Sequence, residues 1–357
     1  MVTNEDFHIR GEAMKHCIYL KKTEPEVSFQ SGEHIFPAGI GGIQKLPLEY
    51  VSHECNNAFS GMEGPFMRSS LLSLPRQFEG PGKRGKLNPN KATKSNVHLI
   101  SNTIDPTAFE LGYTSLGVAY SLPQVKMNKD GNATIILGST VEEDGTEELD
   151  EFKKRLATFE GKYVLIEHEQ YDQDEFILGY LEGKWFVALG NKSLEEEITS
   201  FIERLIEAPL KEELKTETYQ PKTHQILEIN TDEYYRVCAK IIFNYLAYAK
   251  GQDFALRDEF NPLRAWIVHG GGNKFANLTG EEKDFKIPFP DQAHKLFIVK
   301  HGKSLIGYIS FYGNAFTTIV QLCEDFDGVF ELDGFICDWK QRKEYSFIDY
   351  AIALGSN

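Results

Sequence analysis

The stretch "GEHIFPAGIGG" (residues 32–42) constrains the chain most, because it places a carboxylate and a histidine side by side directly before a glycine-rich turn. Glycine adopts backbone conformations that other residues avoid, so Gly39, Gly41 and Gly42 allow a tight turn between two short strands. Neighbouring residues on a strand point to opposite sides. Glu33 and His34 are therefore expected to perform different tasks.

The chain continues with "LEYVSHECNNAFSGMEGPFMRSS" (48–70), in which a short apolar strand precedes a Cys-Asn pair at the start of an expected helix. The order Glu-His, Pro, Gly-Gly and Cys-Asn resembles the HNH endonucleases, which carry a ββα-metal motif. This resemblance covers about residues 14–72 and does not place the rest of the chain. It implies that Glu33 and Asn56 hold one divalent ion and that His34 is the general base.

The residue types suit that chemistry. Hydrolysis of a phosphodiester needs a water, a base that deprotonates it, and a cation that neutralises charge on the phosphate. Oxygen ligands from Glu33 and Asn56 suit Mg²⁺ or Mn²⁺, and an ordinary histidine titrates near pH ~6.5. Arg68, about three turns into the helix after Asn56, is expected to reach a phosphate. The predicted catalytic residues are thus His34 and Arg68.

The chain departs from the HNH pattern in its cysteines. Many HNH proteins hold zinc with two Cys-x-x-Cys pairs, whereas "CIYL" (17–20) and "SHEC" (52–55) each keep one cysteine. A structural zinc is therefore not expected, and apolar packing should replace it, from Ile18, Leu20, Ile35 and Val51. A site of His16, Cys17, His53 and Cys55 is an alternative. The asparagine that steadies the histidine ring in the family has no counterpart between Gly42 and Tyr50.

With 357 residues, the chain is expected to form two or three domains of the α+β class. Apolar runs at 133–138, 163–168 and 184–190 predict strands, and 147–159, 193–207 and 232–249 predict helices. The segment 294–322 predicts three antiparallel strands. The predicted division is an HNH ββα-metal module (1–78), a basic linker (79–94), an α+β domain (95–208), a linker (209–222), and an α+β domain (223–357) with antiparallel strands and a recognition or regulatory role.

Charge is distributed unevenly along the chain. The net charge is −15, yet residues 1–92 carry nearly equal numbers of basic and acidic residues. Residues 76–94 hold six basic side chains and one acid, Glu79, and form either a soluble linker or an arm that binds nucleic-acid backbone. Nucleic acid is therefore expected at the amino-terminal domain. The acidic remainder is expected to contact a protein partner or a small-molecule trigger, or to form a homo-oligomer.

No apolar run is long enough for a membrane span, and five scattered cysteines form no disulfide framework, so a cytoplasmic protein without a membrane partner is expected. The prediction is a divalent-metal-dependent HNH endonuclease that cuts DNA rather than RNA, as a bacterial restriction or antiphage-defence effector. One alternative is a catalytically degenerate protein that binds nucleic acid or a ligand, with its carboxy-terminal domains carrying the function. Another is an effector that acts only after a ligand triggers it.

Overall fold

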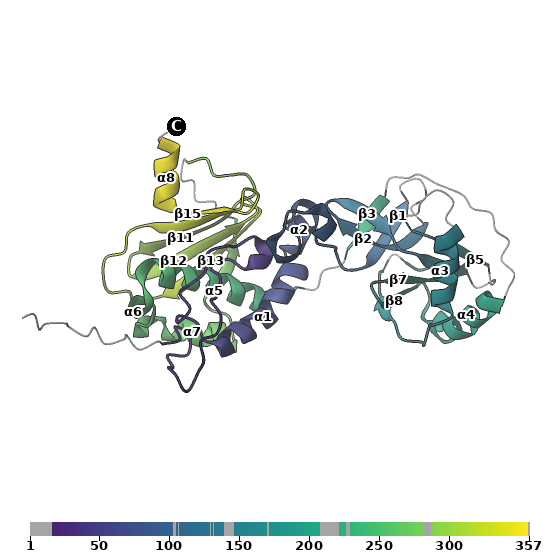
Figure 1. Ribbon diagram of the computed structural model, residues 1–357, viewed down its shortest axis with the longest axis horizontal. Helices are drawn as coiled ribbons and strands as arrows, with labels where there is room; N and C mark the ends of the chain where they lie inside the picture. Colours follow the sequence, from purple (N-terminus) through teal and green to yellow (C-terminus); the bar gives the residue numbers. More distant parts are fainter. Residues whose placement is uncertain are drawn as a thin grey trace, which may run out of the picture. The chain divides into compact units, whose positions relative to one another are not determined.

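The computed structural model describes residues 16–102, 105, 107–128, 130, 132–138, 146–169, 171–207, 221–225, 229–280 and 287–355. Within this part, the protein is a mixed α+β structure with eight α-helices and three sheets (Figure 1). The chain forms two compact units. Unit 1 contains Met1–Arg76, Gly80–Lys91 and Ile229–Asn357, and unit 2 contains Gln77–Glu79 and Ala92–Glu228.

Unit 1 is built on a six-stranded antiparallel sheet in the order β10-β13-β12-β11-β14-β15. Its strands are β10 (Ala276–Thr279), β11 (His294–His301), β12 (Ser304–Phe311), β13 (Phe316–Cys323), β14 (Asp333–Asp338) and β15 (Lys343–Ser346). Buried and partly exposed residues alternate along β12, as expected for a strand with one face on the core. Strands β11, β12 and β13 confirm the three antiparallel strands predicted for 294–322.

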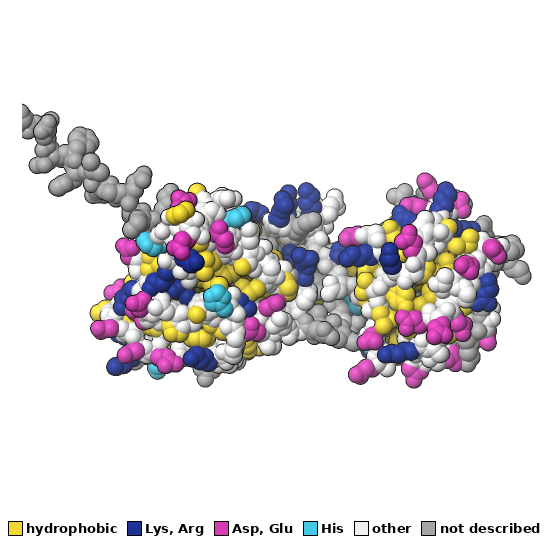
Figure 2. All heavy atoms as spheres, turned by 90° about the horizontal axis from the view of Figure 1, so that it is seen from below, with side chains coloured by type: hydrophobic (Ala, Val, Ile, Leu, Met, Phe, Trp, Pro, Cys, Tyr) yellow, Lys and Arg dark blue, Asp and Glu magenta, His cyan; other side chains and the backbone are white. Residues whose placement is uncertain are grey.

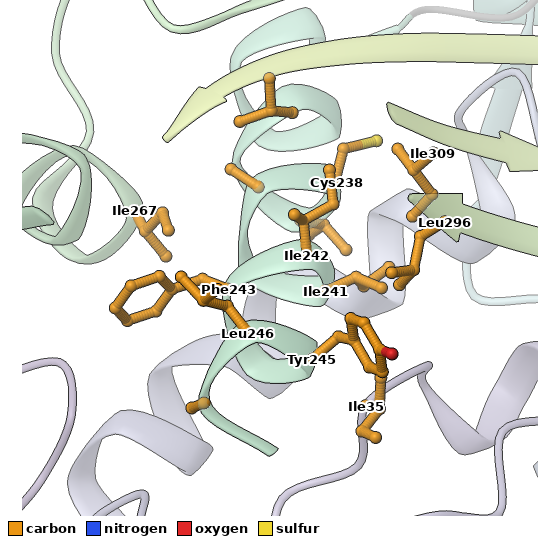
Figure 3. Packing of buried hydrophobic residues seen from close by; sticks show 14 of the residues in the cluster. Ile35, Cys238, Ile241, Ile242, Phe243, Tyr245, Leu246, Ile267, Leu296 and Ile309 are labelled. Carbon is orange, nitrogen blue, oxygen red and sulfur yellow. The ribbon is translucent and has the colours of Figure 1, made fainter. Parts of the chain in front are cut away.

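Helix α5 (Thr231–Lys250) packs against one face of this sheet and forms the centre of unit 1 (Figures 1 and 3). The Asn230 side chain accepts a hydrogen bond from the Glu233 backbone N–H and caps the first turn. The helix approaches β12 closely at Gly307, where a Cβ would lie 2.5 Å from Ile242 Cγ2. The helix predicted for 232–249 is therefore confirmed, and its apolar residues form the main core.

Helix α1 (His53–Arg68) packs on α5 and contributes Phe59 and Phe66 to the same apolar cluster. The Ser52 side chain caps α1 by accepting a hydrogen bond from the Cys55 backbone N–H. The other helices of unit 1 are η1 (Ala38–Ile40), η2 (Lys83–Gly85), η3 (Pro89–Lys91), α6 (Gln252–Ala255), η5 (Asp258–Phe260), α7 (Asn261–His269) and α8 (Phe347–Gly355), those labelled η being 3-10 helices.

Unit 2 contains a four-stranded sheet in the order β3-β2-β1-β9 and a five-stranded sheet in the order β5-β4-β7-β8-β6. The strands are β1 (His98–Asn102), β2 (Phe109–Ser115), β3 (Val118–Ser121), β4 (Gln124–Asn128), β5 (Ala133–Ile136), β6 (Val164–Ile166), β7 (Glu175–Leu181), β8 (Lys184–Leu189) and β9 (Pro221–His224). The helices are α3 (Thr146–Leu156), η4 (Lys192–Glu197) and α4 (Ile198–Glu207), and α2 (Ser73–Glu79) ends within this unit. Strands β5, β6 and β8 and helix α3 confirm the elements predicted at 133–138, 163–168, 184–190 and 147–159. The helix predicted for 193–207 is present as a 3-10 helix, η4, followed by α4.

The observed units differ from the predicted division of the chain. Segments 1–78 and 223–357, predicted as separate domains, lie largely together in unit 1, because α1 and α5 share one apolar core. The predicted linker 79–94 packs into unit 1 over residues 80–91. Of the linker predicted at 209–222, residues 209–220 lie outside the described residues, and Pro221 and Lys222 belong to β9, which pairs with β1. Among the described helices, none has the length and apolar character needed to cross a membrane.

We expect acid to destabilise unit 1 through His294, which is fully buried and accepts a hydrogen bond from the Tyr312 backbone N–H at Nδ1. Burial lowers the pKa of His294 to about 3. Because this lies below the ordinary value near ~6.5, the stabilisation is present above that pH and is lost as the pH falls toward 3. Between pH ~7 and ~5 this residue should lower the free energy of unfolding by about 2 kcal/mol.

The measurement is urea unfolding at both pH values for the native protein, His294→Gln and the exposed-histidine control His301→Gln. We expect His294→Gln alone to lose this part of the pH dependence. An unchanged difference between the two pH values in His294→Gln would contradict the assignment.

Candidate functional site

Residues 33–46 form a minimal antiparallel hairpin, held by a bridge between His34 and Lys45. The Ile35 backbone N–H donates to the Gln44 carbonyl at 3.0 Å, and the Leu46 N–H donates to the Glu33 carbonyl at 2.8 Å. The two strands predicted around the turn are thus reduced to this bridge. The order of hairpin followed by helix α1 is nevertheless present.

The glycine turn of this hairpin is buried inside unit 1. Gly41 has a positive φ of 102°, and a Cβ there would lie 2.4 Å from Trp339 Cβ. A Cβ on Gly42 would lie 1.9 Å from the Phe36 carbonyl oxygen. His294 Nε2 contacts the Ile40 carbonyl oxygen at 3.1 Å. The glycines therefore permit close packing against Trp339, which directly follows β14, as well as the turn itself.

Glu33 points into the core and forms an ion pair with Lys240 from the middle of α5. The Lys240 ammonium also pairs with Glu63, which lies on α1. The side chain of Lys240 is 0% exposed, that of Glu33 is 6% exposed and that of Glu63 is 19% exposed. One buried ammonium thus joins the hairpin, α1 and α5.

A second polar residue of α5 supports this ion pair from one turn further along the helix. Asn244 is fully buried and donates from Nδ2 to the His34 carbonyl at 2.9 Å. Its Oδ1 accepts a hydrogen bond from the Tyr19 hydroxyl at 2.6 Å. Lys240 and Asn244 are four residues apart, so both face the same side of the helix. This side of α5 therefore fixes the backbone on which Glu33 and His34 lie.

Electrostatics keep the Lys240 ammonium charged. Burial by itself lowers the pKa of Lys240, but the carboxylates of Glu33 and Glu63 together outweigh burial and raise it. Burial is also the main cause of the raised pKa of Glu33, and Lys240 acts in the opposite direction. A buried charge is tolerated when it is paired in this way. Glu33, which the HNH resemblance makes a ligand of a divalent ion, is paired here with the Lys240 ammonium.

The structure holds the two predicted metal ligands with different partners. Asn56 donates from Nδ2 to Ser31 Oγ at 2.7 Å, whereas Glu33 is held by Lys240 beside Glu63. Asn56 and Glu63 are seven residues apart on α1, which corresponds to about 10 Å along the helix axis. Glu33 and Asn56 thus have different partners in this arrangement, and an ion shared by the two stays a prediction of the resemblance.

The two predicted catalytic residues differ in burial and come from different elements of unit 1, the hairpin and helix α1. His34 is half-buried, and burial is the main cause that lowers its pKa. Among the described residues, no asparagine side chain and no backbone carbonyl forms a hydrogen bond with the His34 ring. Arg68 is exposed at the end of α1, about 18 Å along the helix axis from Asn56. His34 is next to Glu33 in the chain, and the role of Arg68 stays a prediction.

The cysteine positions converge although no zinc is expected. The sulfur atoms of Cys17 and Cys55 lie 3.8 Å apart, and the Ser52 backbone N–H contacts Cys17 Sγ at 3.5 Å. The hydrogen bond with Cys55 is the main cause that lowers the pKa of Cys17 to about 5. The predicted apolar packing around these residues is confirmed, from Ile18, Leu20, Ile35 and Val51.

Lys240 and Asn244 are the site residues that sequence motifs do not reveal. They occupy inward positions of an otherwise apolar helix, and polar residues in such positions are seldom buried without partners. That pattern marks them as paired residues. It does not identify Glu33 or Tyr19 as the partners.

Comparisons with protein-family models, curated proteins and solved structures find no match for this chain. The HNH resemblance thus stays a prediction. Among the described residues, no group of three or more His, Cys, Asp or Glu side chains is placed to hold a metal ion. The alternative site of His16, Cys17, His53 and Cys55 is accordingly not assembled.

We expect Lys240→Met to destabilise unit 1 by about 3–5 kcal/mol, because it leaves the buried Glu33 carboxylate without its counter-ion. The measurement is the free energy of unfolding in urea. The same substitution at Lys303, whose ion pair with Asp325 is exposed, should cost less than about 1 kcal/mol. Adding Glu33→Gln to Lys240→Met should recover part of the loss. Equal effects at Lys240 and Lys303 would contradict the assigned role of the ion pair.

We also expect Leu20→Cys with Ser52→Cys to create a zinc site. Four thiolates at about 2.3 Å from a tetrahedral zinc lie about 3.8 Å from one another, which is the separation of Cys17 and Cys55. The measurement is metal content after dialysis, together with the spectrum of bound Co²⁺. The single variant Leu20→Cys is the control and should retain no metal. Failure of the double variant to hold zinc would show that positions 17, 20, 52 and 55 are not arranged as a tetrahedral zinc site.

Proposed function

We propose that this protein acts on nucleic acid through unit 1, by means of an HNH-type module formed by the hairpin at 33–46 and helix α1. Support comes from the Glu-His, glycine-turn and Cys-Asn order, from the hairpin bridge between His34 and Lys45, and from the cysteine pair beside it. The proposed partner is DNA rather than RNA. The proposal rests on the resemblance together with this local arrangement.

We further propose that the module binds nucleic acid without metal-dependent cleavage. The observation that carries this is the buried Lys240 ammonium, which pairs with Glu33 and Glu63. A carboxylate that compensates a buried ammonium is not free to ligate Mg²⁺ or Mn²⁺, and separating the pair costs several kcal/mol. The positive charge that a divalent ion supplies in an HNH site is provided here by the protein.

A divalent-metal-dependent HNH endonuclease is the second candidate. It is favoured by His34, which is half-buried and lies next to Glu33, and whose pKa is lowered from its ordinary value. At neutral pH such a ring is unprotonated and can accept a proton from water. This candidate requires Lys240 to leave Glu33 so that Glu33 and Asn56 share an ion, as the resemblance implies.

A plasmid assay separates these two candidates. We expect the native protein to retard DNA in a gel but not to nick or linearise it with Mg²⁺ or Mn²⁺, because Glu33 is paired with the buried Lys240 ammonium. His34→Ala should behave like the native protein. His301→Ala, which changes an exposed histidine elsewhere in unit 1, is the matched control.

Metal-dependent cleavage by the native protein and His301→Ala, slowed by about 100-fold or more in His34→Ala, would overturn the binding proposal in favour of the endonuclease. If the native protein neither binds nor cleaves DNA, both candidate functions are overturned.

A further inference from the structure

Basic side chains from three distant parts of the sequence meet on unit 1. We call them the basic surface, and define it as Lys45, Arg84, Lys86, Lys91, Arg342 and Lys343, all of which are exposed. In the view of Figure 2, dark-blue Lys and Arg side chains are spread over the visible face, in some places without an Asp or Glu side chain beside them. The packing of the loop at 80–91 explains how such a surface forms.

The loop at 80–91 is fixed against the hairpin and against the turn between β14 and β15. Arg342 Nη1 donates to the Gly85 carbonyl at 3.1 Å. Gly85 approaches the hairpin so closely that a Cβ there would lie 2.6 Å from the Ala38 carbonyl oxygen. The Gly82 backbone N–H donates to the Lys86 carbonyl at 2.8 Å and closes the loop. Arg84 and Lys86 are therefore held in place beside Arg342.

The basic surface continues to the hairpin. The Gln44 backbone N–H donates to the Glu344 carboxylate at 2.5 Å, which places Lys45 near the strand that carries Lys343. Lys45 is in turn bridged to His34 through the backbone. The surface thus extends from the loop at 80–91 to the side of unit 1 where His34 lies.

Two acids near this surface, Asp338 and Glu344, accept hydrogen bonds from backbone N–H groups, and neither pairs with the basic side chains of the loop at 80–91 in the described part of the chain. Asp338 is buried and accepts a hydrogen bond from the Gln341 backbone N–H at 3.0 Å, and Glu344 is directed to the Gln44 N–H. In the described part of the chain, no ion pair joins a carboxylate to Arg84, Lys86 or Lys91. Repulsion from Lys91 is the main cause that lowers the pKa of Lys86, and Arg84 adds to it. Uncompensated positive charge therefore accumulates here, in a chain of net charge −15.

We propose that the basic surface binds the backbone phosphates of double-stranded DNA without reading its sequence. This inference rests on the proposed function and adds the binding face and the form of the nucleic acid. Lysine and arginine side chains on loops contact phosphates, whereas base reading needs a helix or strand in a groove. Single strands are held by aromatic platforms. The neighbouring Trp339 is only 1% exposed, and no exposed aromatic residue lies within 80–91.

Fluorescence anisotropy with a labelled duplex of about 30 base pairs tests this proposal across a range of NaCl concentrations. Binding that releases counter-ions gives a linear fall of log Kobs with log salt, with a slope of about −0.9 for each phosphate neutralised. We expect the triple variant Arg84→Gln/Lys86→Gln/Lys91→Gln to reduce the steepness of that slope by about 2–3. Its affinity at low salt should fall at least about tenfold.

The matched control is Lys22→Gln/Lys274→Gln/Lys303→Gln, which changes the net charge equally at exposed residues of unit 1 outside the basic surface. It should keep the native slope. If the first triple variant binds DNA like the native protein, or if the control loses as much affinity, the basic surface is not the binding face. The proposed function would still stand. Tighter binding of a single strand of the same length would overturn the choice of duplex. No binding of DNA by the native protein would overturn the proposed function as well.

Discussion

The buried ammonium of Lys240 is the interaction on which unit 1 depends. Its two counter-ions come from different elements, Glu33 from the hairpin and Glu63 from α1, while Lys240 itself lies on α5. A buried charge is strongly destabilising without its partners. The three elements therefore have to assemble together. Asn244 and Tyr19 complete the same contact, so that the hairpin is held to α5 by polar groups as well as by apolar packing.

This arrangement explains why the two ends of the chain form one unit. The amino-terminal hairpin has only a single bridge of its own and gains its structure from contact with α5 and with Trp339. Helix α5 in turn buries its other faces against the sheet at residues such as Ile242. Unit 2 is inserted between the two halves of unit 1 in the sequence. The motif that resembles a nuclease is thus part of a larger core.

The elements that the sequence predicted well are those whose apolar residues recur at a spacing typical of a strand or a helix. The alternation along 294–322 and the helical spacing along 232–249 mark β11–β13 and α5, because each pattern depends on neighbours within a few residues. The apolar packing around Leu20 also followed from local sequence. The division into domains could not be predicted from local sequence, because the contact between Glu63 and Lys240 spans 177 residues. The sequence shows that Glu33 and His34 are adjacent, but it does not show that Lys240 is the partner of Glu33.

The cation that lies beside Glu33 is the protein's own Lys240 ammonium. The most direct test is a crystal structure of the native protein grown with Mn²⁺, with anomalous scattering used to find the ion. The account predicts no manganese between Glu33 and Asn56, and the Lys240 ammonium in contact with both carboxylates. Manganese bound to Glu33, with Lys240 turned away from it, would contradict the account.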